Sequence, residues 1–172
     1  MRIGNQADLS IVSLDLRVDE QARAVDEFVL AHPQGTAFHR PAWMLAIADA
    51  TANRAHMLTA VGPSGRIRGI LPLHHVKSRL FGEALVSTGF AVDGGILATD
   101  PATVAALASA AQDLARAEGD LSIELRGGPL PAGDWTTTAD EHVGFQRALA
   151  ADDDAELAAV PRKHRAELRK AL

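Results

Sequence analysis

Three arginines near the end of the chain have the spacing and chemistry of an anion-binding stripe. Arg162, Arg165 and Arg169 are three and four residues apart, which places them on one side of a helix. A guanidinium group binds phosphate through two parallel hydrogen bonds, so the stripe could hold the phosphate of a nucleotide-linked or lipid-linked acceptor. The alternative is a solvated helix face beside an acidic body, because a run of charges is usually solvated.

Two further segments carry candidate substrate-binding residues. Lys77 and Arg79 flank Ser78 in an expected turn, where they could bind an anionic substrate or form an ordinary surface turn. Asp93, Gly94 and Gly95 could bring backbone amides and one carboxylate to a substrate amine. The alternative is that this glycine pair only makes a turn or a bulge.

Other reactive residues give weaker signals. His74 and His75 are neighbours in an expected strand, so their side chains point to opposite faces and form no shared metal site. One of them could act as a general base. Ser87 has no His and Asp pattern around it that would make it a nucleophile. Cys and Tyr are absent from the chain. We therefore predict no metal site and name no catalytic residue.

Local patterns predict the strands that must position these residues. Alternation predicts a strand over Ser10–Leu16, and two longer runs predict a hairpin over residues 55–76. Pro72 lies inside the second run, so we expect it at an edge or a bulge, where no donor is required. Further short strands are predicted, and their ranges are Ala84–Thr88, Gly95–Ala98, Leu121–Leu125 and His142–Leu149.

Capping residues and apolar spacing predict the helices. Asp19 is expected to cap a helix that ends near Ala31, and a second helix is expected to begin at Pro41 and bury Trp43. The clearest helix begins after Asp100, with Pro101 in its first turn and Gly119 after its end. Strands, helix and a following strand in this order predict an α/β (α+β) fold. We expect a mixed central sheet with helices on both faces and a short parallel pairing around the helix over residues 101–118.

Composition excludes several classes of protein. The 172 residues are 47% hydrophobic and 23% charged, as in an ordinary globular domain. The net charge is −5, although residues 162–170 hold five bases and only one acid. An acidic body argues against DNA binding. The sequence has no apolar run long enough for a transmembrane segment and no secretory signal, so we expect a cytoplasmic protein.

Several short segments of the chain, taken in order, resemble one family. They are Phe38–Trp43, Gly69–Leu73, Val76–Gly82, Val86–Ser87, Gly94–Gly95, Ile123–Arg126 and Val160–Arg165 with Arg169–Lys170. In this order and spacing they resemble the FemAB-like, GNAT-related acyltransferases, in particular those associated with exopolysaccharide and PEP-CTERM/exosortase loci. The resemblance runs from about Phe28 to the end of the chain.

The resemblance implies a protein of two GNAT-like lobes, of which this chain is the N-terminal one. It implies a GNAT-like lobe over residues 1–160 and a basic helical segment over residues 161–172 that begins the connection to a second lobe. That second lobe would be the partner, and the location would be cytoplasmic near the inner face of the membrane. Family members transfer an acyl or aminoacyl group to an amine of a cell-envelope or exopolysaccharide precursor, with acyl-CoA or aminoacyl-tRNA as donor.

One departure from the family pattern bears on the donor. GNAT domains that bind acyl-CoA hold its pyrophosphate with a glycine-rich loop before a helix. Before Pro101 this chain has Asp93-Gly-Gly-Ile-Leu-Ala-Thr-Asp instead, with the glycines too early and an acid in front of them. We therefore expect no cofactor bound by this lobe. The alternative function is a non-catalytic binding or docking lobe.

Overall fold

The computed structural model describes residues 9–78, 80, 82–139, 145 and 147–171, and it divides into two units. Unit 1 ends at Trp135 and unit 2 begins at Thr136. The strands of unit 1 are β1 (Ser10–Leu14), β2 (Arg54–Val61), β3 (Ile67–Ser78), β4 (Gly82–Ser87), β5 (Leu97–Ala98) and β6 (Ser122–Leu125). Its helices are α1 (Asp19–Ala31), the short 3-10 helix η1 (Ala37–His39), α2 (Pro41–Thr51) and α3 (Pro101–Ala117).

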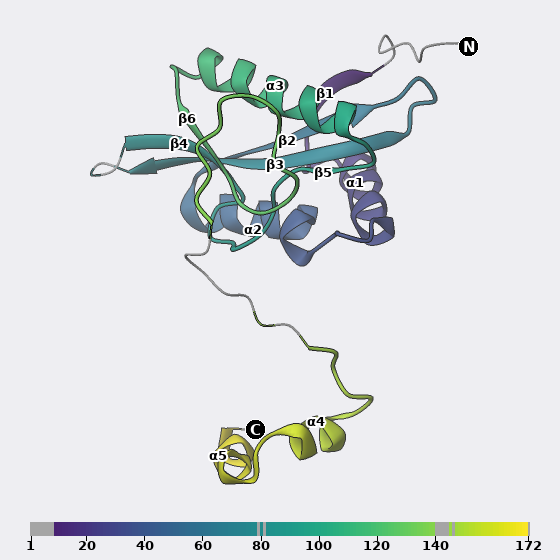
Figure 1. Ribbon diagram of the computed structural model, residues 1–172, viewed down its shortest axis with the longest axis vertical. Coiled ribbons are helices and arrows are strands. Elements are labelled where there is room, and N and C mark those ends of the chain that lie inside the picture. The colour runs from purple at the N-terminus through teal and green to yellow at the C-terminus, as the bar shows by residue number, and fades with distance from the viewer. Residues whose placement is uncertain (1–8, 79, 81, 140–144, 146, 172) are drawn as a thin grey trace. The chain divides into compact units, whose positions relative to one another are not determined.

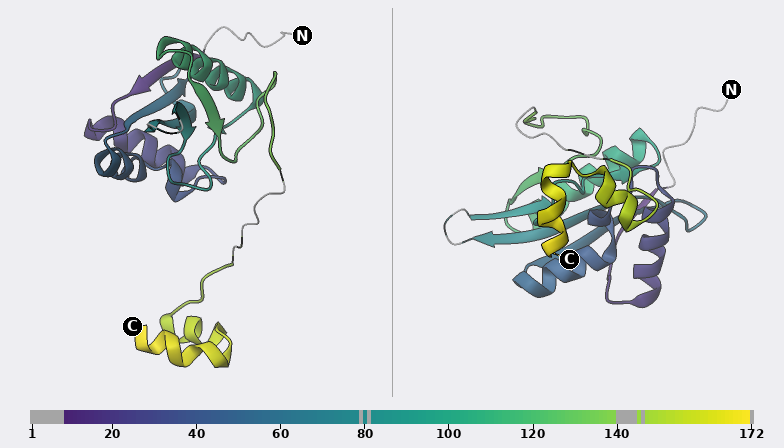
Figure 2. Two further views of the ribbon diagram at one scale, coloured as in Figure 1. Left: turned by 90° about the vertical axis from the view of Figure 1, so that its left-hand side faces the viewer. Right: turned by 90° about the horizontal axis from the view of Figure 1, so that it is seen from below.

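The strands form one mixed sheet in the order β1-β2-β3-β4-β6, with β5 paired to β3. Neighbouring strands run antiparallel except β4 and β6, which are parallel and are connected across α3. Helix α3 covers one face of the sheet, and α1 and α2 cover the other (Figures 1 and 2). The predicted mixed sheet with helices on both faces is therefore confirmed, together with the parallel pairing around the third helix.

Each face of the sheet has its own apolar core. Alternate strand residues, such as Leu58 and Leu71, pack against Leu107 of α3. Their neighbours on the opposite face, such as Met57 and Ile70, pack with the buried side chains of α1 and α2. This alternation follows from the two-residue period of a strand, and it places consecutive residues of β2 and β3 on different faces.

The predicted hairpin is formed by β2 and β3, but the position of Pro72 was predicted wrongly. β3 is a central strand, and its register shift with β2 lies at Ala60 and Val61. Pro72 lies opposite Met57 of β2, and on its other side β5 reaches only Ile70 while β4 begins to pair at His74. The proline therefore occupies the stretch between two partners, where the sheet requires no donor from it.

Smaller differences concern the ends of elements. β1 ends at Leu14, two residues early, and α1 is preceded by Val18, so Asp19 is its first residue and not its cap. Trp43 is only half-buried in α2, whereas Met44 beside it is fully buried. Half of the expected strand over His142–Leu149 lies outside the described residues, and the other half, Phe145 and residues 147–149, forms no strand.

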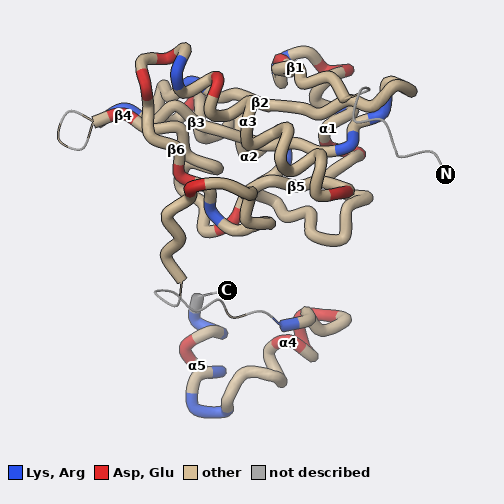
Figure 3. Tube along the Cα trace, turned by 45° about the horizontal axis from the view of Figure 1, so that its top comes forward, with Lys and Arg blue, Asp and Glu red and all other residues tan. Residues whose placement is uncertain are grey.

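Unit 2 contains α4 (Asp153–Ala159) and α5 (Arg162–Ala171). Asp152 caps α4 by accepting a hydrogen bond from the Ala155 amide at 2.8 Å. The predicted basic helix over Arg162–Lys170 is confirmed as α5. Figure 3 shows its Lys and Arg positions and the acidic positions at the start of α4. No residue of α4 is buried.

Candidate functional site

The candidate site lies where the parallel strands β4 and β6 end side by side. Ser87, the last residue of β4, is paired with Leu125 of β6. Two loops leave the sheet at this point: residues 88–96, which we call the junction loop, and residues 126–135. Ends of adjacent parallel strands commonly carry ligand sites in α/β proteins, because the loops that follow them lie close together.

The two loops touch through their glycines. A Cβ atom at Gly95 would overlap the carbonyl oxygen of Gly127, and a Cβ atom at Gly127 would overlap the Asp93 carboxylate. Gly127 also has a positive φ of 68°. Only residues without a side chain allow two backbones to approach this closely, so the glycine pairs of both loops have a structural reason.

The predicted residues Asp93, Gly94 and Gly95 thus lie in the junction loop. The Gly94 amide donates to the Asp93 Oδ1 atom at 2.8 Å, and both glycines are buried. In this arrangement the amide and the carboxylate that were expected to face a substrate amine bond each other. Their role in substrate binding stays a prediction.

A buried histidine holds one side of the junction loop. The His39 Nε2 atom lies 3.2 Å from the carbonyl oxygen of Gly95, and its Nδ1 atom lies 2.8 Å from the Thr36 hydroxyl. Burial lowers the pKa of His39, because the charged ring would lose its hydration. The ring is therefore neutral near pH 7 and fixes the loop through the Gly95 carbonyl.

His74 holds the start of the same loop. The amide of Gly89 donates to its Nδ1 atom at 3.1 Å, so this atom is the acceptor of a neutral ring. Its Nε2 atom then carries the proton and donates to the carbonyl oxygen of Met44 at 3.0 Å. Burial lowers the pKa of His74, and both ring nitrogens are occupied. These contacts make His74 a positioning residue and leave it no atom for general-base catalysis.

Arg126 fixes the middle of the junction loop from the second loop. Its Nη1 atom donates to the carbonyl oxygen of Ala91 at 3.0 Å, and its backbone amide donates to the Ser87 hydroxyl at 3.1 Å. On the other side, the Trp43 indole donates to the carbonyl oxygen of Gly89 at 3.4 Å. Phe90 lies between these anchors with a φ of 60° and exposes 64% of its surface. A bulky residue rarely adopts this conformation, and it persists here because its neighbours are fixed on both sides.

Lys77 lies apart from the junction loop. It is paired with Glu83 at 3.1 Å, near the beginning of β4, whereas the junction loop follows the end of that strand. Its hydrogen bond, with that of His75, lowers the pKa of Glu83. Arg79 lies outside the described residues. Lys77 belongs to β3 and not to the expected turn, and the structure does not bring it together with Asp93. Its anion-binding role stays a prediction.

The three arginines of α5 have different surroundings within unit 2. Arg165 donates to the carbonyl oxygens of Val160 and Ala158, each at 2.7 Å, and so satisfies acceptors at the end of α4. Arg162 and Arg169 are exposed. Arg165 thus joins α5 to the end of α4, a role that the spacing of the three arginines did not indicate.

The beginning of α3 is already occupied by a carboxylate. Asp100 accepts hydrogen bonds from the amide and the hydroxyl of Thr103, each at 2.9 Å, and is paired with Arg68 at 2.9 Å. The Thr103 hydrogen bonds, with those of Thr99 and Arg68, lower the pKa of Asp100 to about 2. A phosphate at this helix end would have to displace an ionised carboxylate.

The described residues include neither a metal-binding cluster nor a membrane-spanning helix. Within that part of the chain, no group of three or more His, Asp or Glu side chains is placed to hold a metal ion. Its helices also include none that is long and apolar enough to cross a membrane.

Sequence reasoning missed His39 and Arg126 as anchors of the site. Both contacts join residues far apart in the chain, and His39 and Gly95 have a sequence separation of 56. The sequence does contain a second glycine pair, Gly127–Gly128, like the pair at Gly94–Gly95. Two such pairs could have indicated that the two loops approach each other closely.

No family model and no curated protein matches this chain. Among solved structures, an acetyltransferase of Trypanosoma brucei is 16% identical with a TM-score of 0.41, over 77% of this chain and 99% of that one. A ribosomal-protein-alanine N-acetyltransferase of Brucella melitensis biovar Abortus 2308 is 17% identical with the same TM-score, over 78% of this chain and 99% of that one.

Proposed function

We propose that this chain is the N-terminal lobe of a FemAB-like N-acyltransferase that acts on an amine of a cell-envelope or exopolysaccharide precursor. The supporting observation is that separate segments of the resemblance meet around the junction loop. Val86–Ser87 of β4 lies beside Ile123–Leu125 of β6, which Arg126 follows, and Gly69–Leu73 lies on neighbouring β3. The segment Phe38–Trp43 supplies both His39 and the Trp43 indole.

The proposed reaction needs positioning more than covalent catalysis by the protein. The amine nitrogen forms a bond to the acyl carbon, and the bond from that carbon to the donor's sulfur or ester oxygen breaks. The nitrogen gives its proton to water, and the leaving group takes one up. Backbone amides that face the carbonyl oxygen would stabilise the developing charge. A junction loop fixed by His39, His74 and Arg126 is suited to hold one substrate in place.

Two separate groups of basic residues, one in each unit, are candidates for binding the anionic part of the acceptor. Arg162 and Arg169 are exposed on α5 and would bind phosphate, whereas Arg165 would remain bonded to α4. Lys77 and Arg79 form the second candidate group. Each substitution to Glu should raise the acceptor KM if that residue contacts the acceptor.

A second candidate function is a docking or acceptor-binding lobe with no chemistry of its own. Two observations favour it: Asp100 fills the beginning of α3, and the Gly94 amide is bonded to Asp93. In that case the donor would bind only to the second lobe, and this chain alone would show no thermal stabilisation by acyl-CoA.

The test is amide formation by the full-length protein in which this lobe is joined to the second. Mass spectrometry would follow the product with acyl-CoA or aminoacyl-tRNA as donor and an amino sugar as acceptor. We expect transfer that Gly95→Ala lowers on the order of 100-fold, because the junction loop would shift, while Gly62→Ala leaves it unchanged.

Three outcomes decide between the candidates. Product that is formed by the full-length protein and lost in Gly95→Ala supports the acyltransferase. The unfolding midpoints of Gly95→Ala and His39→Gln must stay close to that of the unchanged protein, which shows that the variants are folded. Acceptor binding without product, whichever donor is supplied, supports the docking lobe. Product formed by residues 1–172 alone would contradict the division into two lobes.

A further inference from the structure

The edge of β2 is uncovered at its beginning. β1 accompanies β2 only as far as Leu14, which lies opposite Met57, whereas β2 begins at Arg54. After Leu14 the chain turns away, and the Asp15 amide donates to the Gln21 side chain at 2.8 Å. In the described part of the chain, residues 54–56 therefore have β3 on one side and no strand on the other.

The register of β2 shows which backbone groups point to this open side. Met57 lies opposite Pro72, which has no N–H group, so the two cannot form a doubly hydrogen-bonded pair. The N–H and C=O groups of Met57 must then point away from β3, towards β1. Ala55 is two residues earlier and has the same orientation. Its N–H and C=O groups thus point to the side where β1 has ended.

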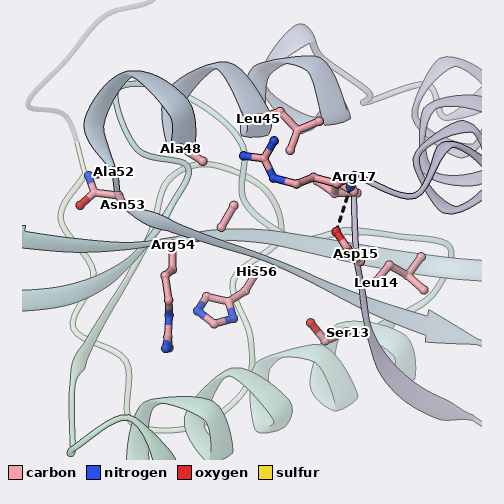
Figure 4. Close-up of a pocket in the computed structure, with 12 residues that line it drawn as sticks. Ser13, Leu14, Asp15, Arg17, Leu45, Ala48, Ala52, Asn53, Arg54 and His56 are labelled. Carbon is pink, nitrogen blue, oxygen red and sulfur yellow. Dashed lines mark hydrogen bonds between the residues drawn. The ribbon is translucent and has the colours of Figure 1, made fainter.

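A hollow of about 480 Å³ lies beside this open edge (Figure 4). Its volume is within the range of sites that bind ligands. Figure 4 shows Leu45, Ala48 and Arg17 on the side of α2, and Arg54 and His56 pointing towards α3. The hollow therefore extends around the edge of the sheet and borders both of its faces.

Two guanidinium groups that border the hollow supply donors for a carboxylate. Arg17 and Arg54 line it from opposite faces, and Asp15 is the single carboxylate among its lining residues. Arg17 is paired with Asp49 and Arg54 with Glu118, in each case through the Nη2 atom alone. The other N–H groups of each guanidinium are available for a further carboxylate.

We propose that this hollow binds an extended acidic peptide segment, which adds a short strand to the open edge of β2. A strand would bond the N–H and C=O groups of Ala55, and its successive side chains would point to the two faces of the sheet. Two consecutive acidic residues would then meet Arg54 on one face and Arg17 on the other. Donors on both faces of the sheet suit a strand, whose side chains alternate between the faces, better than a compact ligand.

The test uses one labelled probe peptide with matched controls, and the full chain. The probe is acetyl-Val-Thr-Glu-Glu-Thr-Val-amide. One control has both Glu residues replaced by Gln, and a second has N-methyl groups on the backbone of the central pair. Affinities come from fluorescence polarisation, and hydrogen exchange at the Ala55 amide is followed by NMR.

We expect the Glu probe to bind about tenfold more tightly than the Gln control, and the N-methylated control to bind no better than the Gln control. Arg17→Ala and Arg54→Ala should each weaken the probe about fivefold. Arg116→Ala, which breaks an exposed ion pair with Asp113 and is not among the lining residues of the hollow, should change it less than twofold. Saturation with the probe should slow exchange of the Ala55 amide about tenfold.

Three results would overturn the proposal. They are no binding of the Glu probe, equal affinity for the Glu and Gln peptides, and unchanged exchange at Ala55 in the presence of bound probe. The last result would mean that the arginines attract the peptide by charge without strand addition. Unfolding midpoints of Arg17→Ala and Arg54→Ala close to that of Arg116→Ala show that the variants are folded.

Discussion

The histidines of this chain show how one residue type takes different roles according to its contacts. His74 is fully buried and uses both ring nitrogens to join α2 to the junction loop. His75, its neighbour on the other face of β3, bonds Glu83 at 2.8 Å, near the opposite end of β4. The expected placement of the two rings on opposite faces is confirmed. The hydrogen bonds of both rings go to other parts of the fold, so both histidines have a structural role.

Replacement of His74 should destabilise the fold according to how many of its bonds are lost. His74→Phe leaves the buried Gly89 amide without its partner and removes the side-chain bond to the Met44 carbonyl, so it should cost about 2–4 kcal/mol of unfolding free energy. His74→Gln can still reach Met44 and should cost less. Urea denaturation at pH 7.5 measures both, with the exposed His164→Phe as control. Equal losses for Phe and Gln would mean that only packing matters at this position.

Acid should weaken the fold through its buried histidines. Burial lowers the pKa of His39, His56 and His74 from the usual 6.5, so the unfolded chain binds protons before the folded chain does. Their stabilisation is complete above pH 6.5 and is lost as the pH falls below it. Each histidine can contribute a slope of up to about 1.4 kcal/mol per pH unit. Urea midpoints from pH 7.5 to 5 should show this fall, with a shallower slope in His74→Gln. A slope unchanged in that variant would contradict the assignment to His74.

At the scale of elements, α3 is the part of the fold that local chemistry specifies most fully. Asp100 caps the helix, Pro101 occupies its first turn, and Gly119 follows its end with a φ of 107°. Its apolar positions face the core formed with β2 and β3. The cap also carries the ion pair with Arg68, which ties the beginning of α3 to β3.

Removal of this cap should destabilise α3 and change the acid response. Asp100→Ala should cost about 0.5–2 kcal/mol, whereas Asp100→Asn should retain most of the cap. Because the pKa of Asp100 is lowered from 3.8 to about 2, its stabilisation is present above pH 3.8 and is lost as the pH falls towards 2. Thermal unfolding of both variants, with the exposed Asp113→Ala as control, measures the effect. An Asp100→Ala variant as stable as Asp113→Ala would show that the cap contributes nothing.

The elements also show what sequence patterns can and cannot predict. The hairpin, the helices and the parallel pairing around α3 were predictable, because each follows from local periodicity, caps and turn residues. The anchoring of the junction loop was not, because His39 and Arg126 meet it only after the sheet has formed. Pro72 illustrates the same limit. The sequence correctly predicts that Pro72 lies where no N–H donor is required. It cannot predict that β5 and β4 pair with β3 on either side of this residue, because that arrangement depends on the whole sheet.

At the scale of the whole molecule, the chain is divided into a unit with an apolar core on each face of its sheet and a unit whose described residues form no core. Unit 1 buries two apolar clusters on the two faces of its sheet. In unit 2, α4 has no buried residue, and its contacts with α5 include the two bonds donated by Arg165. An isolated pair of short helices with so little burial is marginally stable in water.

We therefore expect residues 1–135 to fold independently. The fragment should unfold cooperatively, with a free energy of unfolding within about 1 kcal/mol of that of the full chain. A peptide of residues 136–172 should show weak helicity without a cooperative transition. Circular dichroism during urea titration checks both. A loss of several kcal/mol on removal of residues 136–172 would show that the second unit contributes to the stability of the first.

The bond between Trp43 and the junction loop gives the chain an optical reporter. The sequence has two tryptophans and no tyrosine, so emission excited at the red edge of protein absorption comes from Trp43 and Trp135 alone. In Trp135→Phe the signal comes from Trp43, whose ring lies edge-on to Phe38 with 4.9 Å between centroids and donates to Gly89. Movement of the loop away from Gly89 would free the indole N–H group and shift the emission maximum. Substrate arrival at the loop could then be timed in a stopped-flow instrument without any attached dye.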